Sequence, residues 1–167
     1  RCDWLHLFVV REDASFFPFS ARLAMVRAGV AHLPNVTVHE GSQYIISRAT
    51  FPAYFLKETG KVQRAWSEID ALIFRDHIAP ALGITHRFIG SEPFCDVTRQ
   101  YNETLHQLLA GRIEVVEVPR IRATGSAISA SEVRRLLKTE QFSRIREIVP
   151  ETTFAHLEAH YGAVEVA

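Results

Sequence analysis

The sequence predicts an α/β fold in which helices cover both faces of an open parallel sheet. Residues 4–10 (WLHLFVV) are almost continuously apolar, as expected of a parallel strand that is buried on both sides. A helical pattern follows Pro18, and Pro34-Asn35 breaks the chain before a second short strand at 36–39. This order of strand, loop, helix and strand is the building unit of such sheets, and strands and helices continue to alternate further along.

The remaining elements follow in chain order. Helical spacing after Pro18 places three aliphatic side chains on one side, those of Leu23, Val26 and Val30. We then expect a short helix from Thr50 to Leu56, a longer helix from Ser67 to Ile78, a strand at 87–90, a helix capped by Asp96, a strand at 113–118, a helix after the serines at 126–131, and two short helices from Glu140 onward separated at Pro150.

The longer of these helices, at 67–78, is amphipathic in sequence. Its apolar face is expected to bury Ile69, Leu72 and Ile73. Its opposite, solvated side is expected to carry Asp70, Asp76 and His77.

Length and composition favour one domain spanning residues 1–167, since 18.9 kDa is enough for a sizeable core. The 19 basic and 19 acidic residues balance, which argues against a general nucleic-acid binder. The two cysteines, Cys2 and Cys95, form no Cys-x-x-Cys pattern, and neither a signal peptide nor a long apolar span is present. We therefore expect a reduced cytoplasmic compartment and no membrane partner.

The most informative stretch is 126–135 (SAISASEVRR), which lies between a predicted strand and a predicted helix. Backbone N–H groups at a helix start, together with hydroxyl and guanidinium donors, form a plausible cradle for a polyphosphate. Ser129 followed by Glu132 also fits an ordinary capping box, so the two interpretations stand side by side. The surrounding charge favours an anion, because eight basic and four acidic residues lie between Arg112 and Arg146.

Three segments resemble the citrate (pro-3S)-lyase ligase family, within the HIGH-type nucleotidyltransferase superfamily. They are residues 41–52 (GSQYIISRATFP), 85–95 (THRFIGSEPFC) and 128–134 (ISASEVR). The resemblance spans nearly the whole chain and implies the Rossmann-like nucleotidyltransferase fold. It also implies an ATP-dependent enzyme that forms acetyl-adenylate and pyrophosphate from acetate. The acetyl group would then pass to the prosthetic-group thiol on the acyl carrier subunit of citrate lyase, which activates that enzyme.

The resemblance also assigns site residues. The superfamily's triphosphate-binding segment corresponds here to Ile128, Ser129, Ser131 and Arg134, with Arg134 as the catalytic candidate that stabilises the leaving pyrophosphate. The glycine-ended strand that shapes the nucleotide pocket corresponds to Gly90, Ser91, Glu92, Pro93 and Phe94. Mg²⁺ is inferred from ATP chemistry and not from any cluster of ligands in the sequence.

For several further residues the sequence leaves two possible roles open. Arg120 and Arg122 flank the loop before the serine motif and either reach phosphate or lie solvated. Glu92 either meets ribose hydroxyls or a metal-bound water, or serves as a structural turn carboxylate. Arg48 and Lys57, with Ser47, either recognise acetate or the carrier, as the resemblance implies, or belong to a charged surface loop and helix without such a role.

One feature departs from the superfamily pattern, because its signature His-x-Gly-His is missing from this sequence. That motif follows the first strand of the family's sheet, so we expect the first strand and helix to lie upstream of Arg1. Either that segment or a strand swapped from another copy of the chain would complete the sheet. Two other functions therefore stay open. One is nucleotidyl transfer to a phosphorylated cofactor precursor, and the other is a non-catalytic nucleotide- or carrier-binding fragment.

Overall fold

The computed structural model describes residues 2–11, 16–41, 43–47, 50, 61–93, 95–123 and 126–162, and only the backbone at 61–63, 122–123 and 126–127. The chain divides into two compact units. The first unit comprises Arg1–Val9, Ser15–Glu40 and Ile121–Ala167, and the second comprises Val10–Ala14 and Gly41–Arg120. The short helix expected from Thr50 to Leu56 falls almost entirely outside the described residues.

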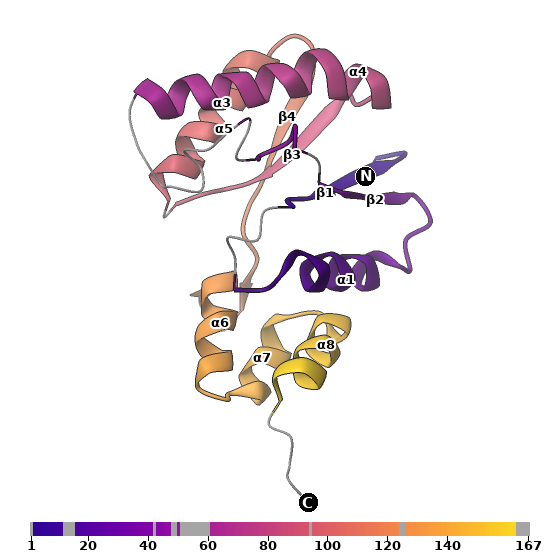
Figure 1. Ribbon diagram of the computed structural model, residues 1–167, viewed down its shortest axis with the longest axis vertical. Coiled ribbons are helices and arrows are strands. Elements are labelled where there is room, and N and C mark those ends of the chain that lie inside the picture. The colour runs from indigo at the N-terminus through magenta and orange to yellow at the C-terminus, as the bar shows by residue number, and fades with distance from the viewer. Residues whose placement is uncertain are drawn as a thin grey trace, which may run out of the picture. The chain divides into compact units, whose positions relative to one another are not determined.

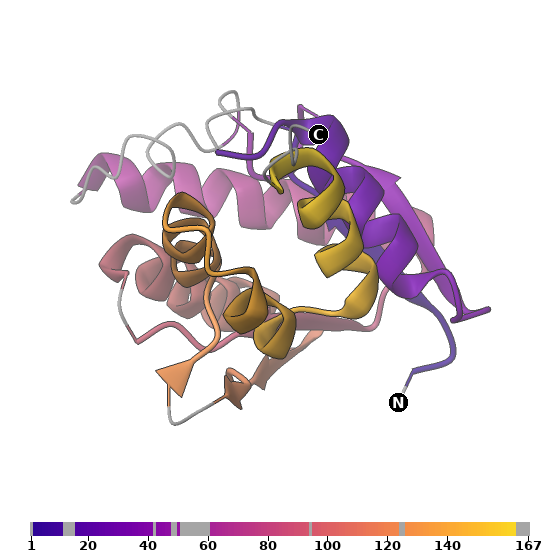
Figure 2. The same cartoon turned by 90° about the horizontal axis from the view of Figure 1, so that it is seen from below.

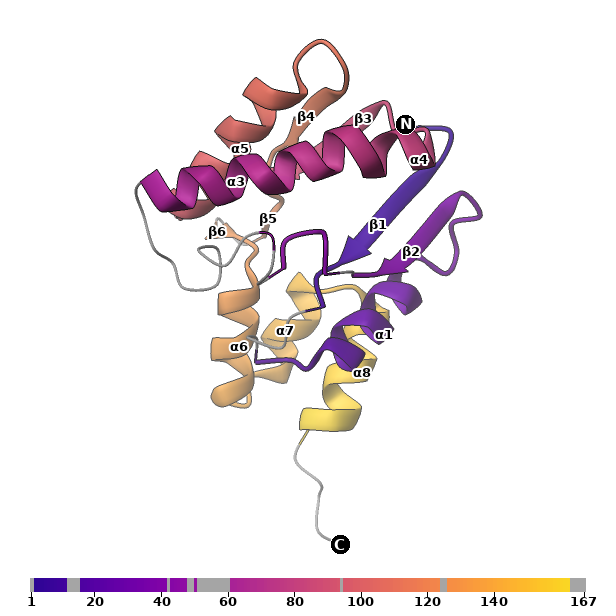
Figure 3. The same ribbon diagram turned by 45° about the horizontal axis from the view of Figure 1, so that its top comes forward.

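The first unit begins with the predicted strand, helix and strand. Strands β1 (Leu5–Val9) and β2 (Val36–Glu40) are parallel, with Leu5 opposite Val36 and Val9 opposite Glu40. Helix α1 (Phe19–Val30) connects them and contacts both strands. Figure 3 shows the two strands side by side, with α1 following β1 in the chain. The predicted order of strand, helix and parallel strand is therefore confirmed for β1, α1 and β2.

Three C-terminal helices complete the first unit: α6 (Ala130–Lys138), α7 (Phe142–Ile148) and α8 (Glu151–Tyr161). Helix α8 packs along α1, as Figure 2 shows. One core cluster of buried side chains comes from these helices and from a residue two positions before α1: Phe17, Val133, Leu136, Leu137, Ile145, Phe154 and Leu157. The two predicted helices after Glu140 are present, and Pro150 lies between them.

Helix α6 ends in a Schellman motif. The amide of Glu140 donates to the Leu137 carbonyl (3.1 Å), and the amide of Gln141 donates to the Leu136 carbonyl (3.0 Å). Glu140 takes the left-handed position of the motif, with φ of 52°. Glycine normally occupies that position because a side chain there is strained.

The second unit packs two helical segments on a parallel strand pair. Strands β3 (His86–Gly90) and β4 (Glu114–Val118) are joined by helix α5 (Asp96–Leu109). Helix α3 (Lys61–Ile73) continues through a π-helical turn, η1 (Phe74–Ile78), into α4 (Ala79–Leu82). Gly83 ends this run with φ of 64°. Figure 1 shows α3 and α5 side by side over the strands. The core cluster of this unit comes from α3, η1, α4, α5 and the residue before β4: Ala71, Phe74, Ala79, Val97, Tyr101, Leu105, Leu109 and Ile113.

The buried face of α3 differs from the one the sequence predicts. Its buried stripe is Ser67, Asp70, Ala71 and Phe74, which keeps the helical spacing but is rotated relative to the predicted face. Ile69 is 41% exposed, and Asp70 is only 1% exposed, so both of those predictions are wrong. The stripe contains a serine and an aspartate that hydrophobicity assigns to solvent. Asp76 and His77 are exposed as predicted.

Two boundaries also shift. The long helix begins at Lys61 rather than near Ser67. Cys95 is the N-cap of α5, so Asp96 stands in the first helical turn instead of at the cap. An acidic residue in that turn still interacts favourably with the helix dipole.

The strands confirm a mixed α/β fold with parallel pairing, but they do not join into one sheet among the described residues. They form three two-stranded sheets: β1–β2, β3–β4 and the short antiparallel pair β5 (Arg122–Ala123) with β6 (Ser126–Ala127). The single open Rossmann-like sheet is therefore not observed as such.

Candidate functional site

The carboxyl end of β3 carries the predicted nucleotide segment. The strand ends at Gly90, and the amide of Ser91 extends the pairing by donating to the Val118 carbonyl (3.0 Å). From α5, the Asn102 side-chain amide donates to the Gly90 carbonyl (3.0 Å). This contact fixes the strand end. Sequence reasoning assigned Asn102 no role, because a polar residue on a helix does not indicate which carbonyl it reaches.

Glu92 and Arg120 form an ion pair at the same edge of the β3–β4 sheet. Their closest atoms, Arg120 Nη2 and Glu92 Oε2, are 2.5 Å apart, and the side chains are 30% and 10% exposed. Arg120 also donates from Nε to the Ser91 carbonyl (2.9 Å), and its backbone amide donates to Ser91 Oγ (3.3 Å). Arg120 is therefore not the solvated loop residue that one interpretation expected.

Glu92 has a second partner. Its Oε1 accepts from the amide of Cys95 (3.1 Å), the residue at the N-cap of α5. A carboxylate that binds an early helix amide acts as a cap and satisfies one of the orphan N–H groups. These contacts match the turn-carboxylate interpretation of Glu92 and engage both of its oxygens.

The start of α6 carries the other predicted phosphate segment. Ser129 is the N-cap, with extended backbone (φ −142°, ψ 150°), and its Oγ accepts from the Glu132 amide (3.2 Å). The capping interpretation is therefore confirmed, and Ile128 anchors the approach by donating its amide to the Ile121 carbonyl (3.0 Å). A cap and an anion site are compatible, because the neighbouring amides still point out of the helix end.

Arg134 and Ser131 meet on the first turns of α6. Arg134 Nη2 donates to Ser131 Oγ (2.9 Å), and Ser131 is exposed. Beside them, Arg135 forms two hydrogen bonds to Glu132 (2.7 and 2.9 Å), and this guanidinium holds the pKa of Glu132 below its usual value. The helix start therefore presents one guanidinium bound to a hydroxyl and a second one neutralised by a carboxylate.

The structure brings the predicted residues together in two groups. Gly90, Ser91, Glu92 and Arg120 lie together in the second unit, with Pro93 exposed after them, and Ile128, Ser129, Ser131 and Arg134 lie together in the first. Phe94, Arg48 and Lys57 fall outside the described residues, as does the side chain of Arg122. Ser47 is buried, so it is not part of a charged surface loop.

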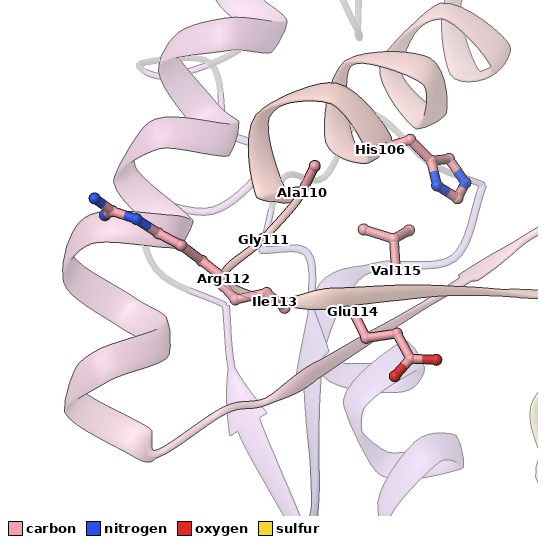
Figure 4. A pocket seen from close by; sticks show the side chains of 7 residues that line it. All are labelled: His106, Ala110, Gly111, Arg112, Ile113, Glu114 and Val115. Carbon is pink, nitrogen blue, oxygen red and sulfur yellow. The ribbon is translucent and has the colours of Figure 1, made fainter.

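A hollow of about 510 Å³ lies at the other end of the β3–β4 sheet. Figure 4 shows its lining, which comes from the end of α5 and the start of β4: His106, Ala110, Gly111, Arg112, Ile113, Glu114 and Val115. It is open to solvent and includes none of the predicted site residues. Ligands of open α/β sheets bind at the carboxyl ends of strands, so we do not assign the nucleotide to this hollow.

The described residues lack two further kinds of feature. No group of three or more histidine, cysteine, aspartate or glutamate side chains is arranged there to hold a metal ion. Within the same residues, every helix is too short or too polar to cross a bilayer.

The fold and the site together define a mixed α/β protein that places candidate ligand-binding residues at the carboxyl end of a parallel strand pair and at a serine-capped helix start. The family model that matches residues 1–157 is that of the citrate lyase ligase C-terminal domain. The chain belongs to this family.

Individual relatives agree with the family. The chain is 51% identical over 164 residues to the citrate (pro-3S)-lyase ligase of Escherichia coli (strain K12), covering 95% of the chain and 47% of the relative. It is 49% identical over 162 residues to that of Klebsiella pneumoniae, covering 94% and 47%. The Haemophilus influenzae ligase is 48% identical over 164 residues, covering 95% and 49%. The chain thus spans about half the length of these curated relatives. No solved structure matches it.

Proposed function

We propose that this chain is the catalytic part of an ATP-dependent acid–thiol ligase that activates citrate lyase. An acetate oxygen attacks the α-phosphorus of ATP, the bond to the bridging oxygen breaks, and acetyl-adenylate and pyrophosphate form. The prosthetic-group thiol of the acyl carrier subunit then attacks the acetyl carbonyl, loses its proton, and releases AMP. The observation that carries this proposal is membership of the citrate lyase ligase family over residues 1–157.

The described residues supply binding and charge. Attack at phosphorus needs alignment and positive charge on the leaving group more than covalent help. At the start of α6, the helix amides and the Ser129 and Ser131 hydroxyls suit the oxygens of the pyrophosphate. Arg134, held by Ser131, adds a charge-assisted donor where negative charge accumulates. We assign the Gly90–Ser91 strand end to the nucleoside side.

The finer fold belongs to the same proposal. Both units would form one nucleotidyltransferase-like domain, in which β1–β2 and β3–β4 belong to one open Rossmann-like sheet with helices on both faces. Two parallel pairs, each with a connecting helix, support this arrangement.

Mg²⁺ was expected from ATP chemistry, and the described residues do not fit a protein-held site for it. They contain no suitable cluster of three ligands. Both oxygens of Glu92, the acidic residue nearest the strand end, are engaged by Arg120 and Cys95. The roles proposed for Ser129, Ser131 and Arg134 do not depend on a metal ligand from this chain.

The test uses the complete gene product that contains this chain. Exchange of pyrophosphate into ATP is measured with and without acetate, in the wild type and in Arg134→Ala. We expect acetate-dependent exchange and a loss of about 2–3 kcal/mol of transition-state binding in the variant, roughly a 30- to 150-fold decrease in rate. Arg144→Ala is the matched control, because Arg144 is an exposed arginine on α7 and should leave the rate unchanged.

The possible results separate the functions. Exchange that requires a phosphorylated acceptor instead of acetate would indicate nucleotidyl transfer to a cofactor precursor. A complete gene product without any exchange would indicate a binding module. Unchanged activity in Arg134→Ala would remove Arg134 from the site.

A further inference from the structure

A carboxylate lies in the interior of the second unit without any assigned role. Asp70, on the buried stripe of α3, is 1% exposed. Its Oδ1 accepts from the Ile46 amide (2.7 Å) and from Thr50 Oγ1 (2.9 Å), and its Oδ2 accepts from the Tyr101 hydroxyl (2.6 Å). Burial of a carboxylate is unfavourable unless hydrogen bonds compensate it, and here three donors do so. Asp70 therefore joins Ile46 and Thr50 to helix α5.

The turn at residues 43–47 has a backbone conformation at Ile46 that local preferences do not explain. Ile46 has φ of 43°, in the left-handed region that β-branched residues rarely adopt. Such conformations persist only where surrounding contacts determine them, and they gather at functional sites. The Ile46 amide is the group that donates to Asp70. Asp70 thus holds the segment at its most strained residue.

Hydrogen bonds link three residues of this region, Gln43, Ser47 and Thr50. Ser47 Oγ donates to the Gln43 carbonyl (2.6 Å) and accepts from the Thr50 amide (3.2 Å). The Ser47 amide donates to Thr50 Oγ1 (3.3 Å), whose own proton goes to Asp70. The Thr50 hydroxyl is therefore the side-chain link between the turn and the carboxylate.

Helix α5 ties this turn to the strand end assigned to the nucleotide. Tyr101 donates to Asp70, and the next residue, Asn102, donates to the Gly90 carbonyl. Arg87 of β3 donates to the Tyr101 hydroxyl (3.2 Å) and lies over the Phe74 ring, 4.1 Å from its centroid. Adjacent residues of one helix thus fix both the turn and the end of β3.

The exposed part of the turn suits a small carboxylate. Gln43 is exposed and Tyr44 is 56% exposed, and the Gln43 side-chain amide donates to the Tyr44 hydroxyl (3.1 Å). An amide and a phenol are both donors that an acid can accept from. The turn also follows β2 in the chain, at the carboxyl end of a parallel strand, where α/β proteins bind ligands.

We propose that Asp70, through Ile46 and Thr50, is a positioning residue that holds the turn at residues 43–47 as the binding element for the carboxylic acid substrate. Asp70 acts through the turn, because it is itself too buried to touch a ligand. Asn102 likewise holds the end of β3, which we assign to the nucleotide, through its hydrogen bond to the Gly90 carbonyl. Binding of the acid and binding of ATP therefore depend on different contacts of α5. This inference rests on the proposed ligase function.

The experiment compares three variants of the complete gene product: Asp70→Asn, Thr50→Val and Thr50→Ser. Asn offers one acceptor oxygen to three donors, and Val keeps the shape of Thr without its hydroxyl. Ser keeps the hydroxyl and is the matched control. Acetate-dependent pyrophosphate exchange gives KM for acetate and for ATP, and hydrogen exchange gives the protection of the Ile46 and Ser47 amides.

We expect Asp70→Asn and Thr50→Val to raise KM for acetate about tenfold and leave KM for ATP within twofold. The Ile46 and Ser47 amides should exchange about tenfold faster in both variants, whereas Thr50→Ser should match the wild type. Unchanged amide exchange would overturn the proposal, as would faster exchange with an unchanged KM for acetate, or a parallel rise of both KM values. A wild type without acetate dependence would instead refute the ligase function itself, and the acid-binding role with it.

Discussion

The ion pair between Glu92 and Arg120 decides whether Arg120 is available to a phosphate. We consider Glu92→Gln, Arg120→Met and the double variant. Glutamine keeps an oxygen that can accept from the Cys95 amide, so Glu92→Gln removes the charge without removing the cap. Methionine keeps most of the volume of the arginine stem. The cycle therefore isolates the interaction between the two charges.

The structure sets the size of the expected coupling. A hydrogen bond to a charged group contributes about 1.5–3 kcal/mol, whereas an exposed ion pair contributes about 0–1 kcal/mol. Glu92 is 10% exposed and Arg120 30% exposed, so solvent screens this pair only partly. We therefore expect a coupling free energy of about 2 kcal/mol, with Glu92→Gln alone destabilising the second unit by a similar amount.

Urea unfolding monitored by tryptophan fluorescence measures this quantity. The chain contains two tryptophans, Trp4 on the approach to β1 and Trp66 on α3. In a Trp4→Phe background, the remaining fluorescence comes from Trp66, which packs against the core of the second unit. The signal then reports the unit that contains the ion pair.

A coupling below about 0.5 kcal/mol would refute the reasoning, because the pair would then behave like an exposed ion pair. Arg120 would in that case be free to bind phosphate at little cost, as one interpretation of the sequence holds. A coupling near 2 kcal/mol would mean that a phosphate recruiting Arg120 must offset that energy.

Three further results are expected. Ser129→Ala should destabilise the first unit by about 1 kcal/mol in urea unfolding, since the Glu132 amide loses its cap; no loss would mean that the cap contributes nothing. Glu140→Gly should stabilise by about 1 kcal/mol in the same measurement, because glycine adopts φ of 52° without strain. Burial, reinforced by a neighbouring histidine, lowers the pKa of both His39 and His156 from 6.5, so the unfolded chain binds more protons and stability should fall as pH drops below about 6.5. His156→Leu should reduce that fall between pH 7.5 and 5.5, and an unchanged fall would exclude His156 as a cause.

The sequence predicted elements well where the signal is local. The apolar strand at 4–10, the break at Pro34 and the cap at Ser129 each depend on neighbours within a few residues. The capping hydrogen bond from the Glu132 amide joins residues three apart, so the spacing alone identifies it. These are the features that the structure confirms.

The hydrophobicity pattern alone could not predict which face of α3 is buried. Ile69, Leu72 and Ile73 form an apolar face, yet the helix buries the face that carries Asp70. Three hydrogen bonds compensate that carboxylate, and their donors lie 20 to 31 residues away in sequence. A helical period fixes the spacing of a buried stripe but not its rotation when polar residues find distant partners.

In the candidate site, too, the features with local signals were predictable and the long-range contacts were not. Residue types indicated ligand binding at 126–135, and the family resemblance assigned it to 90–94; the described parts of both segments lie at an end of a strand or helix. Nothing local showed that Arg120 pairs with Glu92, 28 residues away.

The two arginines of the candidate site consequently differ in what a nucleotide must displace. Arg134 gives up one exposed hydrogen bond to the Ser131 hydroxyl, a neutral group that can rebind to the same phosphate. Arg120 gives up a shielded carboxylate and a bond to the Ser91 carbonyl, and it would leave Glu92 buried without its counter-charge. Binding a phosphate therefore costs less at Arg134 than at Arg120. Arg120 contributes by fixing Ser91 and the strand end, so its loss should weaken nucleotide binding through disorder of that end.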